Sequence, residues 1–68
     1  MTLGERIIKC RELRGWSRNK LAKVAGVPES SVRNYESNSN DPSLFNISCI
    51  ATALGVPLDY LVGLSNKM

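Results

Sequence analysis

The sequence of 68 residues has no histidine, only two cysteines, and no apolar run that approaches the length of a membrane span. A structural zinc site takes about four ligands, so this composition argues against one. Cys10 and Cys49 lie far apart in the chain, and we expect reduced thiols of a cytosolic protein rather than a secreted disulfide. A bilayer-spanning helix needs about 20 apolar residues. We therefore expect no membrane span, and no signal peptide either, because charges interrupt the first ten positions.

The sequence also lacks any arrangement of catalytic residues. It has no glycine-rich phosphate loop and no nucleophile beside a base, and its carboxylates are few and scattered. A chain of 68 residues forms one domain with one core. Its 43% hydrophobic and 22% charged residues are typical of a globular rather than a disordered protein. We expect neither an enzyme nor a cofactor.

Positive charge is concentrated in the first half of the chain. The net charge is only +3, but eight of the nine basic side chains lie within residues 1–33: Arg6, Lys9, Arg11, Arg14, Arg18, Lys20, Lys23 and Arg33. This asymmetry indicates either a surface that faces a polyanion or the solvated side of ordinary helices. Charge alone does not separate the two.

Residues 17–36 predict two short helices joined by a tight turn. Ser17 is a good N-cap for the first of them, which carries on one face Leu21, Ala22 and Ala25. Gly26 follows, and a residue without Cβ turns the chain there at little cost. Pro28 suits the first turn of the next helix, because its missing N–H would have no partner there.

The second of these helices has an inner face formed by Val32 and Tyr35, three residues apart. The small side chain of Ala22 allows the two helices to cross closely. Two such helices around a tight turn are a helix-turn-helix, whose second helix enters the major groove of DNA.

Three further helices complete an all-α prediction. Residues 2–14 form the first, with Thr2 and Glu5 at capping-box spacing and a core stripe of Leu3, Ile7 and Cys10. Residues 37–43 are a loop by composition. Ser43 caps a helix that Gly55 ends, with an inner face of Leu44, Ile47, Ile50, Ala51 and Leu54. A short fifth helix opens at Val56 and Pro57 and ends near Gly63, and little is expected to fix residues 64–68 in place.

Several motifs fall in order along residues 3–63: Leu3-Gly4-Glu5-Arg6-Ile7, Arg11, Gly15, Leu21-Ala22, Gly26-Val27, Tyr35-Glu36, Asp41-Pro42-Ser43-Leu44, Ala51-Thr52-Ala53-Leu54-Gly55-Val56 and Leu58-Asp59-Tyr60-Leu61. In this order they resemble the phage repressor/Cro-like (Xre-type) helix-turn-helix family. The resemblance implies a compact five-helix bundle of the lambda-repressor-like type that binds operator DNA as a dimer to control transcription.

The chain departs from the pattern of that family at three places. Arg18 stands where glutamine is common, and Pro28 stands where serine or threonine usually caps the helix. Because of these two differences, the DNA sequence that the protein recognises cannot be inferred from its relatives. The usual glycine of the following loop is replaced by Ser37-Asn38, and Asn38 can substitute because asparagine tolerates a positive φ.

The exposed face of residues 28–36 is expected to read DNA bases. The resemblance places base contacts at Glu29, Ser30 and Asn34. Asn34 can pair bidentately with adenine, and Arg33 with guanine or a phosphate. Glu29 either accepts a hydrogen bond from cytosine or simply favours the positive end of its helix. Arg18 reaches either a phosphate or an outer base.

A second set of polar residues is expected to contact phosphates, which positions the protein without reading sequence. Free N–H groups at the starts of the second and fourth helices suit anions such as phosphates. The alternative is that these residues are polar only because loops are polar in any protein. Position in the family favours the functional interpretation for the whole set: Ser17, Asn19, Ser31, Ser37, Asn38, Ser39, Asn40 and Ser43.

The resemblance further implies a partly buried ion pair between Arg11 and Glu36, which we expect to lock the orientation of the helix that reads DNA. It also implies a homodimer, because paired half-sites about 34 Å apart supply the specificity that one helix lacks. The interface is expected at Val56, Pro57, Leu58, Tyr60 and Leu64. Phe45 is either a second candidate for this interface or packs under the 37–43 loop.

Together these features predict a helix-turn-helix DNA-binding domain over residues 1–64, followed by a short tail at 65–68. We expect a transcriptional repressor of phage or mobile-element type, in the cytoplasm at the bacterial nucleoid, on a pseudo-palindromic operator. Its expected partners are double-stranded DNA and a second copy. A small-molecule ligand is not expected, because few residues follow the last helix. The alternative is a protein–protein module for an antirepressor, toxin or polymerase subunit, with only weak DNA binding.

Overall fold

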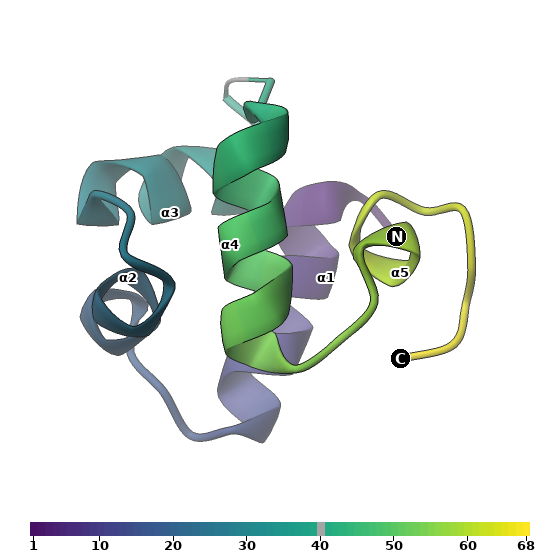
Figure 1. The fold of residues 1–68 in the computed structure, drawn as a ribbon, viewed down its shortest axis with the longest axis horizontal. Helices are drawn as coiled ribbons and strands as arrows, with labels where there is room; N and C mark the ends of the chain where they lie inside the picture. The colour runs from purple at the N-terminus through teal and green to yellow at the C-terminus, as the bar shows by residue number, and fades with distance from the viewer. Residues whose placement is uncertain (40) are drawn as a thin grey trace.

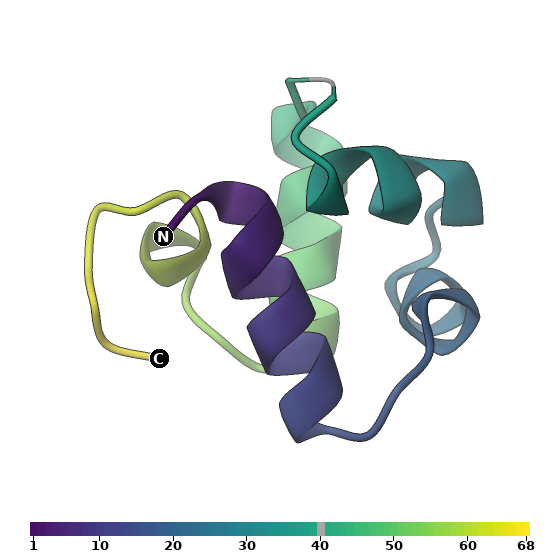
Figure 2. The ribbon, with the colours of Figure 1, turned by 180° about the vertical axis from the view of Figure 1, so that it is seen from behind.

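The structure, a computed structural model, describes residues 1–39 and 41–68 and forms five α-helices within them. These are α1 (Leu3–Leu13), α2 (Arg18–Ala25), α3 (Glu29–Glu36), α4 (Leu44–Leu54) and α5 (Leu58–Leu61). Helix α4 runs through the middle of the view, with α2 and α3 to one side and α5 to the other (Figure 1). From behind, α1 crosses in front of α4 and contacts both α3 and α5 (Figure 2). The predicted all-α, five-helix architecture is confirmed.

Hydroxyl side chains begin three helices where the sequence predicted caps. Thr2, Ser17 and Ser43 each accept a hydrogen bond from the backbone N–H three residues further on, at 3.2, 3.0 and 3.1 Å. The Glu5 carboxylate accepts from the Thr2 N–H at 2.8 Å, which completes a capping box. These hydrogen bonds from Thr2 lower the pKa of Glu5. Because Thr2 and Arg14 are caps, α1 is one residue shorter at each end than predicted.

Residues with positive φ end two helices and shape the loop after α3. Gly26 and Gly55 adopt φ values of 75° and 70°, in the left-handed region that closes α2 and α4. Asn38 has a φ of 57°, so asparagine does substitute for the loop glycine as predicted. Its side-chain oxygen also accepts from the Gly4 N–H at 3.1 Å, which ties the loop to the start of α1.

One apolar core holds the bundle together, and its largest fully buried side chains come from every helix: Ile7, Leu21, Val32, Ile50 and Leu61. One predicted core position is wrong. Leu44 is 72% exposed, although its place in the sequence fits the inner stripe of α4. A helical side chain leans toward the N-terminus, so from the first residue of α4 it extends past the end of the helix instead of over a neighbour.

The helix-turn-helix is packed against α1 at a point of very close approach. A Cβ atom on Gly4 would lie only 2.3 Å from the Glu36 carbonyl oxygen and 2.7 Å from that of Tyr35. Glycine is therefore required at this position by space, because its φ is ordinary and helical. The contact sets the distance between α1 and the C-terminal end of α3.

The segment after α5 is fixed in place, contrary to prediction. The buried Arg6 guanidinium donates to the carbonyl oxygens of Tyr60 and Ser65 and to the side chain of Asn66, at 3.0 to 3.1 Å. It also lies 4.6 Å from the centre of the Tyr60 ring, which adds a cation–π contact. Pairing with a residue about 60 positions away is a tertiary contact, which sequence spacing does not reveal.

Both cysteines are free thiols, with Cys10 buried and Cys49 half-buried. Burial raises the pKa of the Cys10 thiol, since the charged form is disfavoured away from water. Among the described residues, no helix combines the length and apolar character needed to cross a membrane. The same residues hold no group of three or more potential metal ligands.

Candidate nucleic-acid interface

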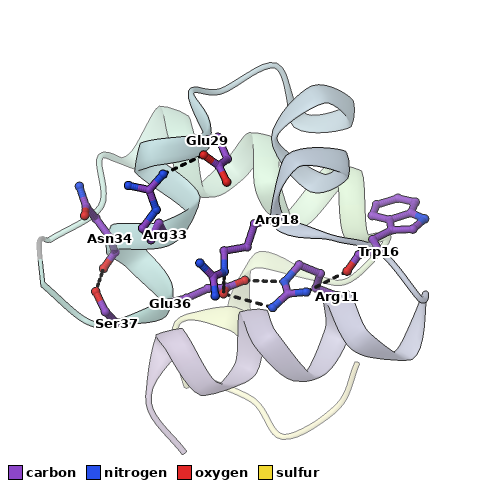
Figure 3. Close-up of polar contacts among 8 residues, drawn as sticks. All are labelled: Arg11, Trp16, Arg18, Glu29, Arg33, Asn34, Glu36 and Ser37. Carbon is purple, nitrogen blue, oxygen red and sulfur yellow. Dashed lines mark hydrogen bonds and ion pairs between the residues drawn. The ribbon is translucent and has the colours of Figure 1, made fainter.

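The outer face of α3 is polar and directed away from the core. Val32 and Tyr35 are buried beneath it, which leaves Ser30 and Arg33 exposed and Asn34 half-buried. The Asn34 carbonyl oxygen accepts from the Ser37 hydroxyl at 3.1 Å, so its backbone is fixed while its amide projects from the outer side of α3 (Figure 3). The fold thus gathers three of the predicted base-reading residues on one surface.

Glu36 at the end of α3 binds two arginines. Arg11 of α1 donates from Nε to one carboxylate oxygen at 2.6 Å and from Nη2 to the other at 3.3 Å. Arg18 at the start of α2 lies with Nε 3.1 Å from the same carboxylate. Both guanidinium groups point toward Glu36 in Figure 3. The cluster therefore links α1, α2 and α3.

These two arginines differ in exposure. The side chain of Arg11 is 12% exposed and that of Glu36 only 6%, whereas Arg18 is 47% exposed. Arg11 also donates to the Trp16 carbonyl oxygen at 2.8 Å. Arg11 is thus a largely buried structural cation, while Arg18 has one side on the carboxylate and the other in solvent. The predicted pair of Arg11 with Glu36 is confirmed, whereas the pair of Arg18 with Glu36 was not predicted from the sequence.

A third ion pair lies within α3 itself. Arg33 Nη2 is 2.8 Å from Glu29 Oε1, one turn apart along the helix (Figure 3). Glutamate four residues before a cation is the favourable order on a helix, so spacing alone could have revealed this pair. Both side chains are partly exposed. The sequence suggested that Glu29 either contacts a base or favours the positive end of its helix. The structure adds an ion pair with Arg33.

Two of the predicted phosphate contacts, Ser17 and Asn19, lie at the start of α2. A hollow of about 350 Å³ is lined by Arg11, Ser17, Arg18, Asn19 and Glu29. The Ser17 hydroxyl is engaged as the N-cap, and Asn19 is exposed. Backbone N–H groups in the first turn of a helix attract anions. The hollow therefore combines cationic side chains with such a turn.

The remaining predicted phosphate contacts lie on α3 and in the loop that follows. Ser31 is half-buried, and Ser37 and Ser39 are exposed with their hydroxyl oxygens 2.6 Å apart. The Asn38 side chain is engaged with α1, and the Ser43 hydroxyl caps α4. Asn40, also predicted to contact a phosphate, lies outside the described residues.

The predicted dimer surface needs one correction. Tyr60 is only 3% exposed and packs in the core against Arg6, so it offers no surface to a partner. Its position in a one-turn helix was ambiguous in sequence, because so short an element has no reliable periodicity. Leu64 and Pro57 are exposed, Val56 and Leu58 are half-buried, and Phe45 is 75% exposed rather than packed under the loop.

Comparison with known proteins places this geometry in a family. A family model described as helix-turn-helix matches residues 7–61, which includes all five helices in whole or part. The chain belongs to the helix-turn-helix family. This result agrees with the resemblance drawn from the motifs and with the pairing of α2 and α3.

The chain is similar to proteins that are named as a transcriptional regulator and as a repressor. The prophage-derived regulator YonR of Bacillus subtilis is 32% identical over 59 residues, which cover 87% of this chain and 55% of YonR. The immunity repressor of Bacillus phage phi105 is 33% identical over 63 residues, covering 93% of this chain and 44% of that protein. The chain thus spans about half the length of these two relatives.

Solved structures share the same fold. The N-terminal DNA-binding domain of SinR from Bacillus subtilis superposes with a TM-score of 0.83 at 32% identity, over 87% of each chain. The P22 c2 repressor, solved in complex with a synthetic operator, gives a TM-score of 0.86 at 27% identity, over 91% of this chain and 94% of that one. The helix-turn-helix family member described here therefore has the five-helix bundle of phage repressors.

Proposed function

We propose that this protein binds double-stranded DNA sequence-specifically as a homodimer and represses transcription, with α3 in the major groove. The observation that carries the proposal is the outer face of α3, where Ser30, Arg33 and Asn34 share one polar surface bordered by the start of α2. Relatives named as repressors, and a neighbour solved on its operator, support the same conclusion.

Direct readout in this proposal depends on side chains with matching donors and acceptors. The Asn34 amide both donates and accepts, as adenine N6 and N7 require, and the Arg33 guanidinium matches guanine O6 and N7. Ser30 hydrogen-bonds to either kind of base. The hollow at the start of α2, with Ser17, Arg18 and Asn19, receives a phosphate and sets the register of α3 in the groove.

We expect Asn34→Ala to weaken binding to the operator by about tenfold or more, the loss of one bidentate base contact per half-site. Fluorescence anisotropy on duplex DNA from upstream of the gene measures this, with a scrambled duplex at two salt concentrations. The wild type should prefer the upstream duplex by at least about 10³-fold. Thr52→Ala, at an exposed position of α4, is the matched control and should bind as wild type.

Equal, weak and salt-sensitive binding of wild type to both duplexes would refute the proposal, since that is the pattern of non-specific attraction. The other candidate function, a protein–protein module, would then gain support. The structural feature that favours it is a hollow between α2 and α4 lined mainly by apolar or uncharged side chains, including Val24, Phe45 and Cys49.

Dimerisation is proposed through the turn before α5 and the residues around it. Leu64 is 79% exposed and lies near Pro57 in the chain, and an apolar surface of this kind is typical of a subunit contact. Phe45, at 75% exposure on α4, defines a second candidate surface. A two-fold arrangement would place two α3 helices about 34 Å apart on one face of the duplex.

Leu64→Glu is expected to abolish the dimer, because two carboxylates would meet at the two-fold axis without partners. Sedimentation velocity across a concentration series measures the change. Leu13→Glu, on the outer side of α1 and 69% exposed, is the matched control and should leave the dimer intact. A dimer lost in Phe45→Glu but retained in Leu64→Glu would assign the interface to α4 instead.

A further inference from the structure

Each partly exposed arginine of the proposed interface is already paired with a carboxylate. Arg18 Nε lies 3.1 Å from Glu36 Oε1, and Arg33 Nη2 lies 2.8 Å from Glu29 Oε1. The four side chains carry two positive and two negative charges. The surface that would face DNA is therefore less cationic than its arginines alone suggest, and Arg11, which is 12% exposed, adds little outward charge.

The two carboxylates differ in what they do for the fold. Glu36 is buried and is bound through both oxygens by Arg11, so it links three helices. Glu29 has 40% of its side chain exposed, and its ion pair is confined to one turn of α3. Its charge stabilises α3 only modestly, through its place in the first turn and this exposed pair, so Glu29 can be changed with little cost to the fold.

Glu29 also borders the hollow at the start of α2, together with Ser17, Arg18 and Asn19. Its carboxylate is thus close to the place where a DNA phosphate would bind. A negative charge at that place repels every phosphate, whatever the base sequence.

We infer that Glu29 is a specificity-determining residue that acts through Arg33. It holds the guanidinium by one nitrogen and suppresses the attraction of the interface for DNA backbone in general. A guanidinium has five N–H donors on two bidentate edges, Nε with Nη2 and Nη1 with Nη2, so Arg33 can keep Glu29 on one Nη2 hydrogen while its other edge pairs with a base. This inference rests on the proposed function and deepens it, because it assigns Glu29 neither a base contact nor a helix-end role.

The physical basis is that specific and non-specific binding depend differently on charge. Non-specific binding comes almost entirely from phosphate neutralisation. Each neutralised phosphate makes the slope of log K against log salt more negative by about 0.9. Specific binding adds base contacts whose geometry the Glu29–Arg33 pair favours by fixing the rotamer of Arg33. A carboxylate on Arg33 therefore weakens non-specific binding more than specific binding.

The test is Glu29→Gln, which removes the charge and keeps the size of the side chain. We expect affinity for the scrambled duplex to rise about threefold to fivefold, the upper part of the range for a partly exposed ion pair, with a salt slope steeper by about one phosphate. Affinity for the operator should change less than about twofold, so the specificity ratio falls. Glu12→Gln, at an exposed site on α1, makes the same change in net charge and should leave that ratio unchanged.

A double-mutant cycle with Arg33→Gln tests whether Glu29 acts through Arg33. In that background Glu29→Gln should no longer change the specificity ratio. Two results would overturn the inference: an undiminished effect without Arg33, or a loss of operator affinity alone, which would make Glu29 a base contact. Failure of the proposed function is seen separately, because wild type would then bind both duplexes alike before any variant is compared.

Discussion

Replacing Arg11 with methionine is expected to lower the free energy of unfolding by about 3 kcal/mol, the lower end of the cost of breaking a buried ion pair. The Glu36 carboxylate is 6% exposed, and both of its hydrogen bonds to α1 come from Arg11, at 2.6 and 3.3 Å. Arg18 would remain at 3.1 Å and compensate in part. For a domain of this size the melting temperature should fall by about 12 to 24 °C.

Thermal unfolding followed by circular dichroism measures this, with Arg33→Met as the matched control. Arg33 loses an ion pair of similar length at an exposed site, where such pairs are worth at most about 1 kcal/mol. The double variant Arg11→Met, Glu36→Leu should recover part of the loss, since no buried carboxylate is then left without its partner. An Arg11→Met protein with the same melting temperature as the wild type would show that the Arg11–Glu36 pair does not stabilise the fold.

Replacing Gly4 with alanine should destabilise the fold by about 2 to 3 kcal/mol, as overpacking of a tight contact does. Within a helix this substitution ordinarily stabilises by about 0.5 to 1 kcal/mol. Here the added Cβ would lie 2.3 Å from the Glu36 carbonyl oxygen, and a backbone atom cannot turn aside as a side chain can. Helix α1 must then move away from α3, which also disturbs the Arg11–Glu36 pair.

Urea unfolding gives the stability change, and the anisotropy titration shows whether the displaced α3 binds DNA more weakly. Gly15→Ala is the control: its Cβ would meet no atom within 4 Å, so only the φ of +70° opposes it. That strain costs roughly 1 to 2 kcal/mol and leaves α3 in place. A Gly4→Ala variant that is more stable than wild type would mean that the close approach does not exist in solution.

Local signals in the sequence were enough to predict the helices. Caps at Thr2, Ser17 and Ser43 and the turn at Gly26 depend on residues within four positions of one another. Interactions of this range are encoded by neighbours in the chain, so no knowledge of the fold is needed to recognise them. The outer face of α3 was also predictable from neighbours in the chain. The buried side chains of Val32 and Tyr35 define its inner side, and the opposite side faces solvent.

Of the three ion pairs at the candidate site, the sequence predicted only the one between Arg11 and Glu36. Arg18 was expected to contact DNA directly, and the structure places it on Glu36, 18 positions away in the chain. The Glu29–Arg33 pair lies four positions apart and was open to prediction from helical spacing. The roles of these arginines therefore depend on which carboxylate is within reach, and for Arg18 only the packed helices decide that.

The sequence by itself determined the number of helices, their approximate ends and the paired α2 and α3, because those depend on short-range hydrogen bonds and on the period of the apolar residues. Only the tertiary structure decided which polar residues are buried. Arg6 anchors the segment after α5, Tyr60 lies in the core, and Leu44 extends beyond the end of its helix. The outcomes for Arg6 and Tyr60 depend on contacts between residues distant in the chain, which form when the helices pack, whereas that of Leu44 follows from its place at the start of α4.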